Sequence, residues 1–170
     1  MIIRRHLVTL WALLLASCGT TVAQSVAVFD FELIDTSLEG AIRGVRPDEQ
    51  ERLARLSDQF RQRLRESGRF SLVALVPLAD EAQASNLQAC GGCDMHLAQP
   101  IGAELANTGT VQKVSNLILN MNIYVRDTSS RTTIAAMSAD MRGNTDESWS
   151  RTLDWLVRNR LLAPGYGLQR

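Results

Sequence analysis

The stretch TVQKVSNLILNMNIYVRD, residues 110–127, decides the fold because it contains the clearest two-residue alternation in the chain. One set of its side chains is apolar: Leu117, Leu119, Met121, Ile123 and Val125. The set between them is polar or amphipathic: Asn116, Asn120, Asn122, Tyr124 and Arg126. This alternation is typical of a strand with one buried face and one face in solvent. We therefore predict a strand whose apolar face packs against the rest of the domain.

A second alternation follows. The polar segment DTSSRT, residues 127–132, leads into a run whose alternate residues are Thr133, Ala135, Met137, Ala139 and Met141. Two alternating segments joined by a polar turn are typical of an antiparallel hairpin. Amphipathic helices before and after the hairpin can cover its apolar face. We predict a single α/β domain of α+β-like character, with a mixed sheet, a long antiparallel hairpin and flanking helices in two or three layers.

Two segments have the periodicity of amphipathic helices. The first begins near Pro47 and ends at Gly68, with apolar residues at Leu53, Leu56, Phe60 and Leu64. The second follows Asn144, which is predicted to form a capping box with Glu147. Its apolar stripe consists of Trp149, Leu153, Leu156 and Leu161, with Trp155 beside them. At helical spacing we interpret this stripe as core rather than as a shelf for a ligand.

Two further apolar runs predict buried strands. The run VAVFDFEL, residues 26–33, is apolar at its start and acidic at its end, as expected of a central strand. The run FSLVALV, residues 70–76, ends before Pro77. Residues 34–48 contain two glycines and a proline without a clear period, so we predict a long loop there.

The first 23 residues have the features of a secretory signal peptide. Arg4 and Arg5 precede an apolar run, residues 7–16, that is too short for a stop-transfer helix. The sequence LASC at 15–18 resembles a lipobox, which would lipidate Cys18, whereas TVA at 21–23 resembles an ordinary cleavage site. We predict a periplasmic or secreted protein whose mature domain spans residues 24–170. Membrane attachment is expected only if Cys18 is lipidated.

Charge and motifs restrict the possible functions. The full sequence has 18 basic and 18 acidic residues, and loss of the two leader arginines leaves 16 against 18, a net charge of −2. This balance gives no electrostatic footprint for nucleic acid. The chain has no nucleophile elbow, no phosphate-binding loop and no dinucleotide fingerprint, and His96 is the only histidine outside the leader. The sequence therefore supports no enzymatic activity and predicts no cofactor.

The CGGCDMH stretch, residues 90–96, contains the most reactive side chains of the mature chain. In an oxidising compartment, the spacing of Cys90 and Cys93 favours a local structural disulfide. A redox-active pair is the second interpretation, because a helix N-terminus lowers the pKa of a thiol. The third is a copper or zinc site made by Cys90, Cys93 and His96, with Asp94 or Met95 nearby. Covalent haem attachment is not expected, because Asp94 stands where the motif requires histidine.

Acidic residues gather at the end of the first predicted strand and in the loop after it. They are Asp30, Glu32, Asp35 and Glu39. Ligands bind at this end of the strands in open α/β sheets, so these residues are candidates for binding a ligand or a hard cation. Without the spacing of a known calcium loop, solubilising loop acids are the simpler interpretation. Lys113 falls on the apolar face of its strand, where we expect an exposed strand end rather than a buried ion pair.

Several motifs resemble known families. A helix ending in Gly102 and Ala103, followed by a strand with GTV at 109–111, resembles the α/β domains of the Tol-system periplasmic propeller protein and of the curli-secretion lipoprotein. The segments VFDFEL, CDMHLAQPIGAEL, VQKVSNLILNMNIYVRD and RGNTDESW are similar to a family of small secreted bacterial proteins of unknown function. That likeness covers nearly all of the mature chain. The resemblance implies an accessory role in periplasmic quinoprotein alcohol oxidation, because members of that family often lie near genes for it.

These features together predict a non-catalytic accessory or binding protein of the periplasm or cell envelope. Its expected partner is an envelope protein or a small ligand bound at the loop end of the sheet. The alternative is a thiol-disulfide or metal-handling protein that uses Cys90, Cys93 and His96.

Overall fold

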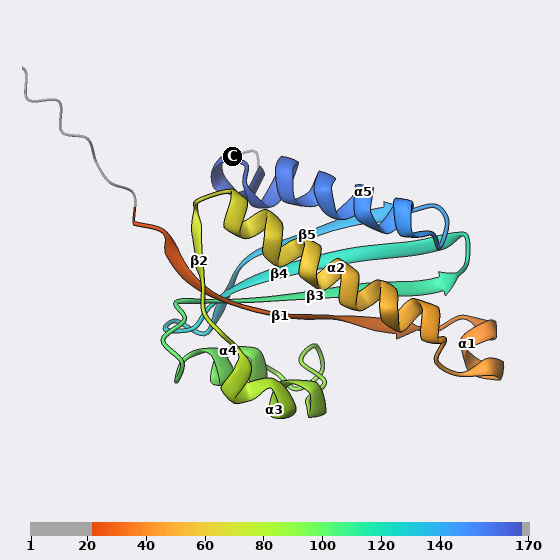
Figure 1. Cartoon of the computed structure of the whole chain (residues 1–170), viewed down its shortest axis with the longest axis horizontal. Helices are drawn as coiled ribbons and strands as arrows, with labels where there is room; N and C mark the ends of the chain where they lie inside the picture. Colours follow the sequence, from red (N-terminus) through yellow and green to blue (C-terminus); the bar gives the residue numbers. More distant parts are fainter. Residues whose placement is uncertain (1–21, 168–170) are drawn as a thin grey trace, which may run out of the picture.

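A five-stranded mixed sheet lies at the centre of the protein (Figure 1). The computed structural model describes residues 22–167, so Cys18 and the leader through residue 21 lie outside the described residues. The strands are β1 (Gln24–Asp35), β2 (Phe70–Leu72), β3 (Leu105–Ser115), β4 (Ile118–Asp127) and β5 (Thr132–Met141), in the order β2-β1-β3-β4-β5. β1 is parallel to both of its neighbours, whereas β3, β4 and β5 pair antiparallel. The predicted mixed sheet and hairpin are confirmed.

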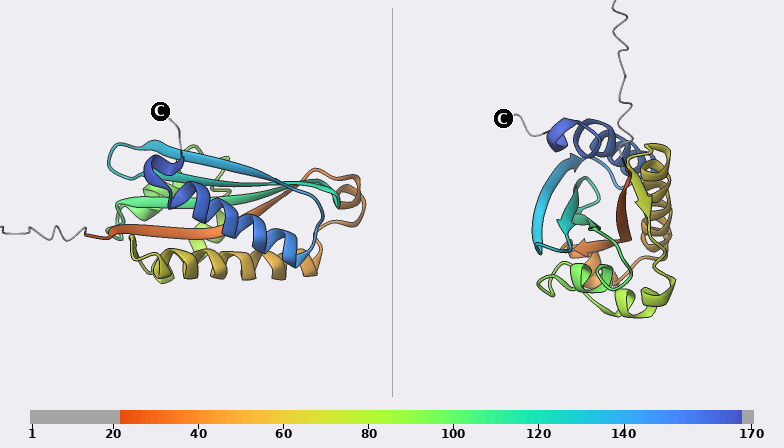
Figure 2. Two further views of the ribbon diagram at one scale, coloured as in Figure 1. Left: turned by 90° about the horizontal axis from the view of Figure 1, so that it is seen from above. Right: turned by 90° about the vertical axis from the view of Figure 1, so that its left-hand side faces the viewer.

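Helices lie against both faces of the sheet and give three layers (Figure 2). The long helices α2 (Pro47–Glu66) and α5 (Asp146–Leu156) cover one face, and α5 continues into a π-helical turn, Val157–Leu161. The short helices α3 (Ala79–Ala84) and α4 (Cys93–Ala98) lie on the other face, and α1 (Leu38–Arg43) lies at one end of the sheet. None of the helices within residues 22–167 combines the length and apolar character needed to cross a membrane.

The larger core lies between the sheet and the two long helices. The strand side includes Leu119, Met121, Ile123 and Val125, and the helix side includes Leu53, Leu56, Phe60, Leu64, Trp149, Leu153, Leu156 and Leu161. Both predicted helical stripes are therefore core. A smaller core under α4 contains Ala27, Phe29, Leu87, Leu97, Ala98, Ala103 and Ala106. The sheet thus buries apolar residues on both faces of β1 and β3.

The stretch that was predicted as one strand is two strands joined by a tight turn. β3 ends at Ser115 and β4 begins at Ile118, so residues 110–127 contain a hairpin of their own. The Ser115 Oγ accepts hydrogen bonds from the backbone N–H groups of Leu117 and Ile118, each at 3.2 Å. Leu117 was expected to face the core but is 74% exposed in this turn. The alternation holds only from Leu119 onwards.

Three other boundaries differ from the prediction. β2 stops at Leu72, and the chain leaves the sheet before Val76. The predicted loop at 34–48 contains α1, whose N-cap Ser37 accepts from the Gly40 N–H at 3.1 Å. The N-cap of α5 is Thr145 rather than Asn144, because the Thr145 Oγ1 accepts from the Ser148 N–H at 3.2 Å. Asn144 instead contacts groups from other elements.

Gly109 of β3 leaves room for the ring of Phe31 of β1. A Cβ atom at this position would lie 2.3 Å from the ring of Phe31, which is buried and packs edge-on against Phe60 at 5.6 Å. We expect Gly109→Ala to lower the free energy of unfolding by roughly 1–3 kcal/mol, as overpacked core sites do. Urea denaturation measures this change. Adding Phe31→Leu should restore part of the loss, whereas full stability of Gly109→Ala alone would contradict this packing.

Candidate functional site

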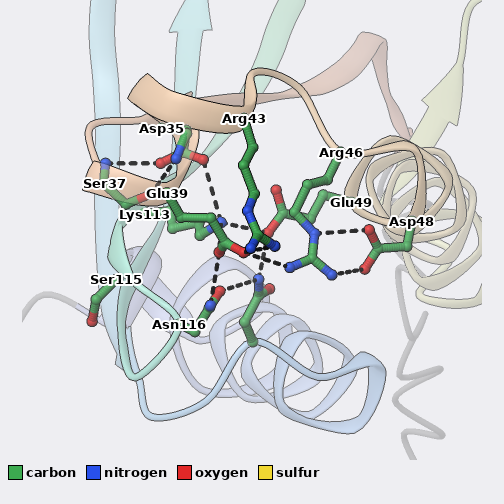
Figure 3. Close-up of polar contacts among 12 residues, drawn as sticks. Asp35, Ser37, Glu39, Arg43, Arg46, Asp48, Glu49, Lys113, Ser115 and Asn116 are labelled. Atoms are coloured by element: carbon green, nitrogen blue, oxygen red, sulfur yellow. Dashed lines mark hydrogen bonds and ion pairs between the residues drawn. The ribbon is translucent and has the colours of Figure 1, made fainter.

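Lys113 is fully buried, contrary to the exposed strand end expected from the sequence. Its Nζ lies 2.7 Å from the Glu49 Oε1, 3.3 Å from the Asp35 Oδ2 and 3.4 Å from the Glu39 Oε2 (Figure 3). Glu49 lies in the first turn of α2 and is itself buried, whereas Asp35 ends β1 and Glu39 lies in α1. One ammonium group therefore joins four elements. We call these four residues the Lys113 cluster.

Asparagines and an arginine surround the Lys113 cluster. Asn116, in the β3–β4 turn, donates to the Glu39 Oε2 at 2.8 Å, and Asn144, before α5, donates to the Glu49 Oε1. Arg46 binds the Glu39 Oε1 at 3.0 Å and places two nitrogens on the Asp48 carboxylate, each at 3.0 Å. These bonds hold the loop after β1 against the β3–β4 turn (Figure 3).

The cluster favours its charged forms. Burial opposes the charge on Lys113, but the hydrogen bonds with Glu49 and Asp35 outweigh burial and raise the pKa of Lys113. Burial likewise opposes ionisation of Asp35, and hydrogen bonds from Ser37 and Lys113 lower its pKa overall. The hydrogen bond from Asn116 is the largest cause of the lowered pKa of Glu39. Because each charge has close partners, the arrangement suits a structural clamp better than proton transfer.

The loop after β1, the β3–β4 turn and the strand ends that they join carry a set of exposed apolar side chains, which we call the apolar tip. They are Ile34, Leu38, Ile42, Val45, Val114, Leu117 and Ile118. Their exposure ranges from 40% for Ile34 to 76% for Leu38. The hydrogen bond between Asn116 and Glu39 brings the β3–β4 turn beside α1, so both parts of the tip lie at the same end of the sheet (Figure 1). Apolar clusters of this kind are uncommon on surfaces that only face water.

A hollow of about 840 Å³ lies along β1, between α2 and the segment that follows β2. Asp30 and Glu32 line it, together with Arg61 and Arg65 of α2. Asp30 is exposed and pairs with the Arg61 Nη2 at 2.6 Å. The Glu32 Oε1 accepts from the Leu87 N–H at 2.9 Å, and burial raises the pKa of Glu32. The volume is within the range of ligand-binding pockets.

The structure separates the four acidic residues that the sequence grouped as a ligand site. Asp30 and Glu32 line the hollow, whereas Asp35 and Glu39 belong to the Lys113 cluster. Among residues 22–167, no three His, Cys, Asp or Glu side chains are arranged to hold a metal ion. The acids therefore do not form one cation site here, and Lys113 fills the space between Asp35 and Glu39.

The two cysteines of the CGGC loop lie at disulfide distance, and the structural disulfide stays a prediction. The sulfur atoms of Cys90 and Cys93 lie at bonding distance, and Cys93 is the first residue of α4. His96 is exposed on α4 and joins no metal-binding group in the described part of the chain. Asp94 is fully buried and binds Arg126 of β4 at 2.7 Å, a contact that the sequence did not indicate. This ion pair fixes α4 on the sheet.

Comparisons with known proteins show the fold and the family. The C-terminal domain of LpoB from Salmonella enterica is 14% identical over 74% of this chain and 87% of that domain, with a TM-score of 0.52. LpoB from Escherichia coli is also 14% identical, with a TM-score of 0.52 over 74% of this chain and 60% of that protein. TolB from Acinetobacter baumannii is 13% identical over 81% of this chain and 28% of that protein, with a TM-score of 0.45.

No curated protein matches the chain. The family model DUF3280, described as "Protein of unknown function (DUF2380)", matches residues 24–161. The match covers every strand and all of α1 to α5, so it spans the sheet and both cores. The chain therefore belongs to this family of unknown function.

Proposed function

We propose that this protein is a non-catalytic accessory module of the bacterial cell envelope that docks on a partner protein through the apolar tip. The exposure of the tip carries this proposal. Leu38 and Ile42 of α1 and Leu117 of the β3–β4 turn are each more than 70% exposed, although contacts of the Lys113 cluster through Glu39 hold α1 and the turn in place. A rigid apolar surface needs no ordering when it binds, which favours affinity.

A partner protein fits the tip better than a membrane does. The charged residues beside the tip are ion-paired with one another, as Arg46 is with Glu39 and Asp48. Attraction to anionic lipid requires a cluster of basic side chains, and the net charge of residues 24–170 is −2. The tip also lies at the opposite end of β1 from the point where residue 22 enters (Figure 1).

The envelope assignment is supported by the leader-like first 23 residues and by the resemblance of the chain to a family of small secreted bacterial proteins. Support of periplasmic alcohol oxidation is the more specific role that the family resemblance implies. We include this role in the proposal because a module that docks on a partner protein suits an accessory of a larger oxidation system.

Site-specific photo-cross-linking in intact cells tests the docking surface. A benzophenone side chain at Ile42 should give a defined adduct with one envelope protein, identified by mass spectrometry. The same probe at Gln62, an exposed position on α2 far from the tip, should not give it. Leu117→Asp, on the other half of the tip, should abolish the Ile42 adduct. Adducts only with lipid or with a second copy, or equal adducts at both positions, would overturn the proposal.

A further inference from the structure

Among residues 22–167, no strand pairs with most of the edge of β1 that faces away from β3. β2 pairs only with Gln24–Val26, and the last backbone bond on this side runs from the Val73 N–H to the Val26 C=O at 2.9 Å. After that bond the chain departs toward α3, whereas β1 continues to Asp35. The hollow of about 840 Å³ lies along this part of β1.

Side chains of α2 occupy two of the hydrogen-bonding positions that a neighbouring strand would fill. The Ser57 Oγ accepts from the Phe31 N–H at 2.9 Å, and the Arg61 Nη2 donates to the Val28 C=O at 3.1 Å. Ser57 is almost fully buried and also donates to the Leu53 C=O at 2.9 Å. Side chains of α2 therefore supply hydrogen-bond partners for the Val28 C=O and the Phe31 N–H.

Beyond these contacts the β1 main chain faces the hollow. The Thr36 N–H donates to Lys113 of β3 at 2.9 Å, so the even-numbered residues here direct their main-chain groups toward β3. Main-chain groups alternate between the two edges of a strand. The C=O of Phe31 and both the N–H and C=O of Leu33 therefore point away from β3, toward the space between β1 and α2.

The walls of the hollow suit an extended chain. Apolar side chains along it come from β1, α2 and the segment after β2: Val28, Phe31, Leu33, Leu53, Leu72 and Val73. Arg61 is already paired with Asp30, whereas Arg65, one helical turn further toward the C-terminus of α2, places a guanidinium group at the end of the hollow nearest β2. A small apolar ligand would leave the edge of β1 unpaired, whereas a peptide main chain would pair with it.

We propose that this hollow binds an extended peptide that adds a strand beside the Phe31–Leu33 part of β1. Main-chain hydrogen bonds to Phe31 and Leu33 supply the pairing, as in other cases of strand addition to a sheet edge. The peptide places an acidic side chain or its C-terminal carboxylate at Arg65. This site is separate from the apolar tip and goes beyond the docking function proposed for it.

Phage selection of short random peptides on the protein comprising residues 24–170 provides the probe. Fluorescence anisotropy then measures the affinity of the selected peptides. Ala54, an exposed residue of α2 that lines the hollow, is replaced by tryptophan to fill the space. We expect Ala54→Trp to weaken binding about tenfold or more. The matched variant Gln62→Trp, on the same helix outside the hollow, and the tip variant Leu38→Asp should bind as the parent does.

N-methylation of the peptide tests the pairing itself. Methyl groups on alternate amides, those facing β1, should each weaken binding about tenfold, and methyl groups on the amides between them should not. Failure to select any peptide, or binding that is insensitive to Ala54→Trp, would overturn the site. Uniform tolerance of N-methylation would overturn strand addition. Because Leu38→Asp is included, loss of tip docking and loss of peptide binding are measured separately.

Discussion

Replacing Lys113 with methionine is expected to lower the free energy of unfolding by about 3–5 kcal/mol, the cost of breaking a buried ion pair from one side. The variant removes the ammonium group but leaves the Glu49 carboxylate, which is only 1% exposed, without its partner at 2.7 Å. Chemical denaturation of parent and variant measures the difference. Arg43→Met removes an exposed cation from the same end of the molecule, and its cost should stay below about 1 kcal/mol.

A second substitution, Glu49→Leu, distinguishes the cost of an unpaired buried charge from the cost of lost side-chain packing. In the Lys113→Met background it removes the unpaired buried charge, so the double variant should recover more than half of the stability lost by the single variant. A single variant as stable as the parent, or a double variant that is less stable than the single, would show that the cluster does not clamp the loop.

The pH dependence of stability follows from the same contacts. The pKa values of Asp35 and Glu39 are lowered in the folded protein, so both carboxylates stabilise the fold fully above their ordinary pKa values of about 4. This stabilisation is lost as the pH falls further, through the lower folded-state values. The pKa of Lys113 is raised in the folded protein, so its ammonium group stabilises the fold fully below its ordinary pKa of about 10.5. This stabilisation is lost as the pH rises through the higher folded-state value. Lys113→Met should therefore have a flatter stability profile at both extremes.

The two tryptophans of α5 should differ sharply in how much their replacement with alanine lowers the free energy of unfolding. Trp149 is 1% exposed, and Arg52 of α2 lies over its ring at 5.2 Å, so Trp149→Ala should cost about 3–5 kcal/mol through loss of burial and a cavity between α2 and α5. Trp155 lies on the same helix but is 46% exposed, and Trp155→Ala should cost less than about 1 kcal/mol. Thermal and urea unfolding of both variants measure the contrast. Equal costs would mean that α5 is rotated relative to the sheet.

Regular periodicity explains which parts of the fold could be predicted. The stripes on α2 and α5 and the alternation from Leu119 to Val125 repeat often enough to identify the buried face without tertiary information. The turn at Asn116 and Leu117 could not be predicted from the pattern, because the apolar–polar alternation of the sequence continues across it by coincidence. Its signal was local, since Ser115 can accept from the two amides that follow.

The candidate sites depend on contacts that no local pattern contains. Lys113 meets partners from positions 35, 39 and 49, and its burial follows from the parallel pairing of β1 with β3. The hollow exists because β2 is short, although the FSLVALV run looked like a full strand. The sequence did place acidic residues at the end of β1, but the tertiary structure divides them between two sites.

The docking claim is tested most directly by calorimetric titration of the cross-linked partner, once purified, into the protein of residues 24–170. The double variant Leu38→Asp, Leu117→Asp should raise the dissociation constant about 100-fold, since both substitutions place charge in the proposed interface. Gln62→Asp, on the exposed face of α2, should leave it unchanged. If the tip double variant binds as tightly as the parent while remaining folded, the apolar tip is not the docking surface.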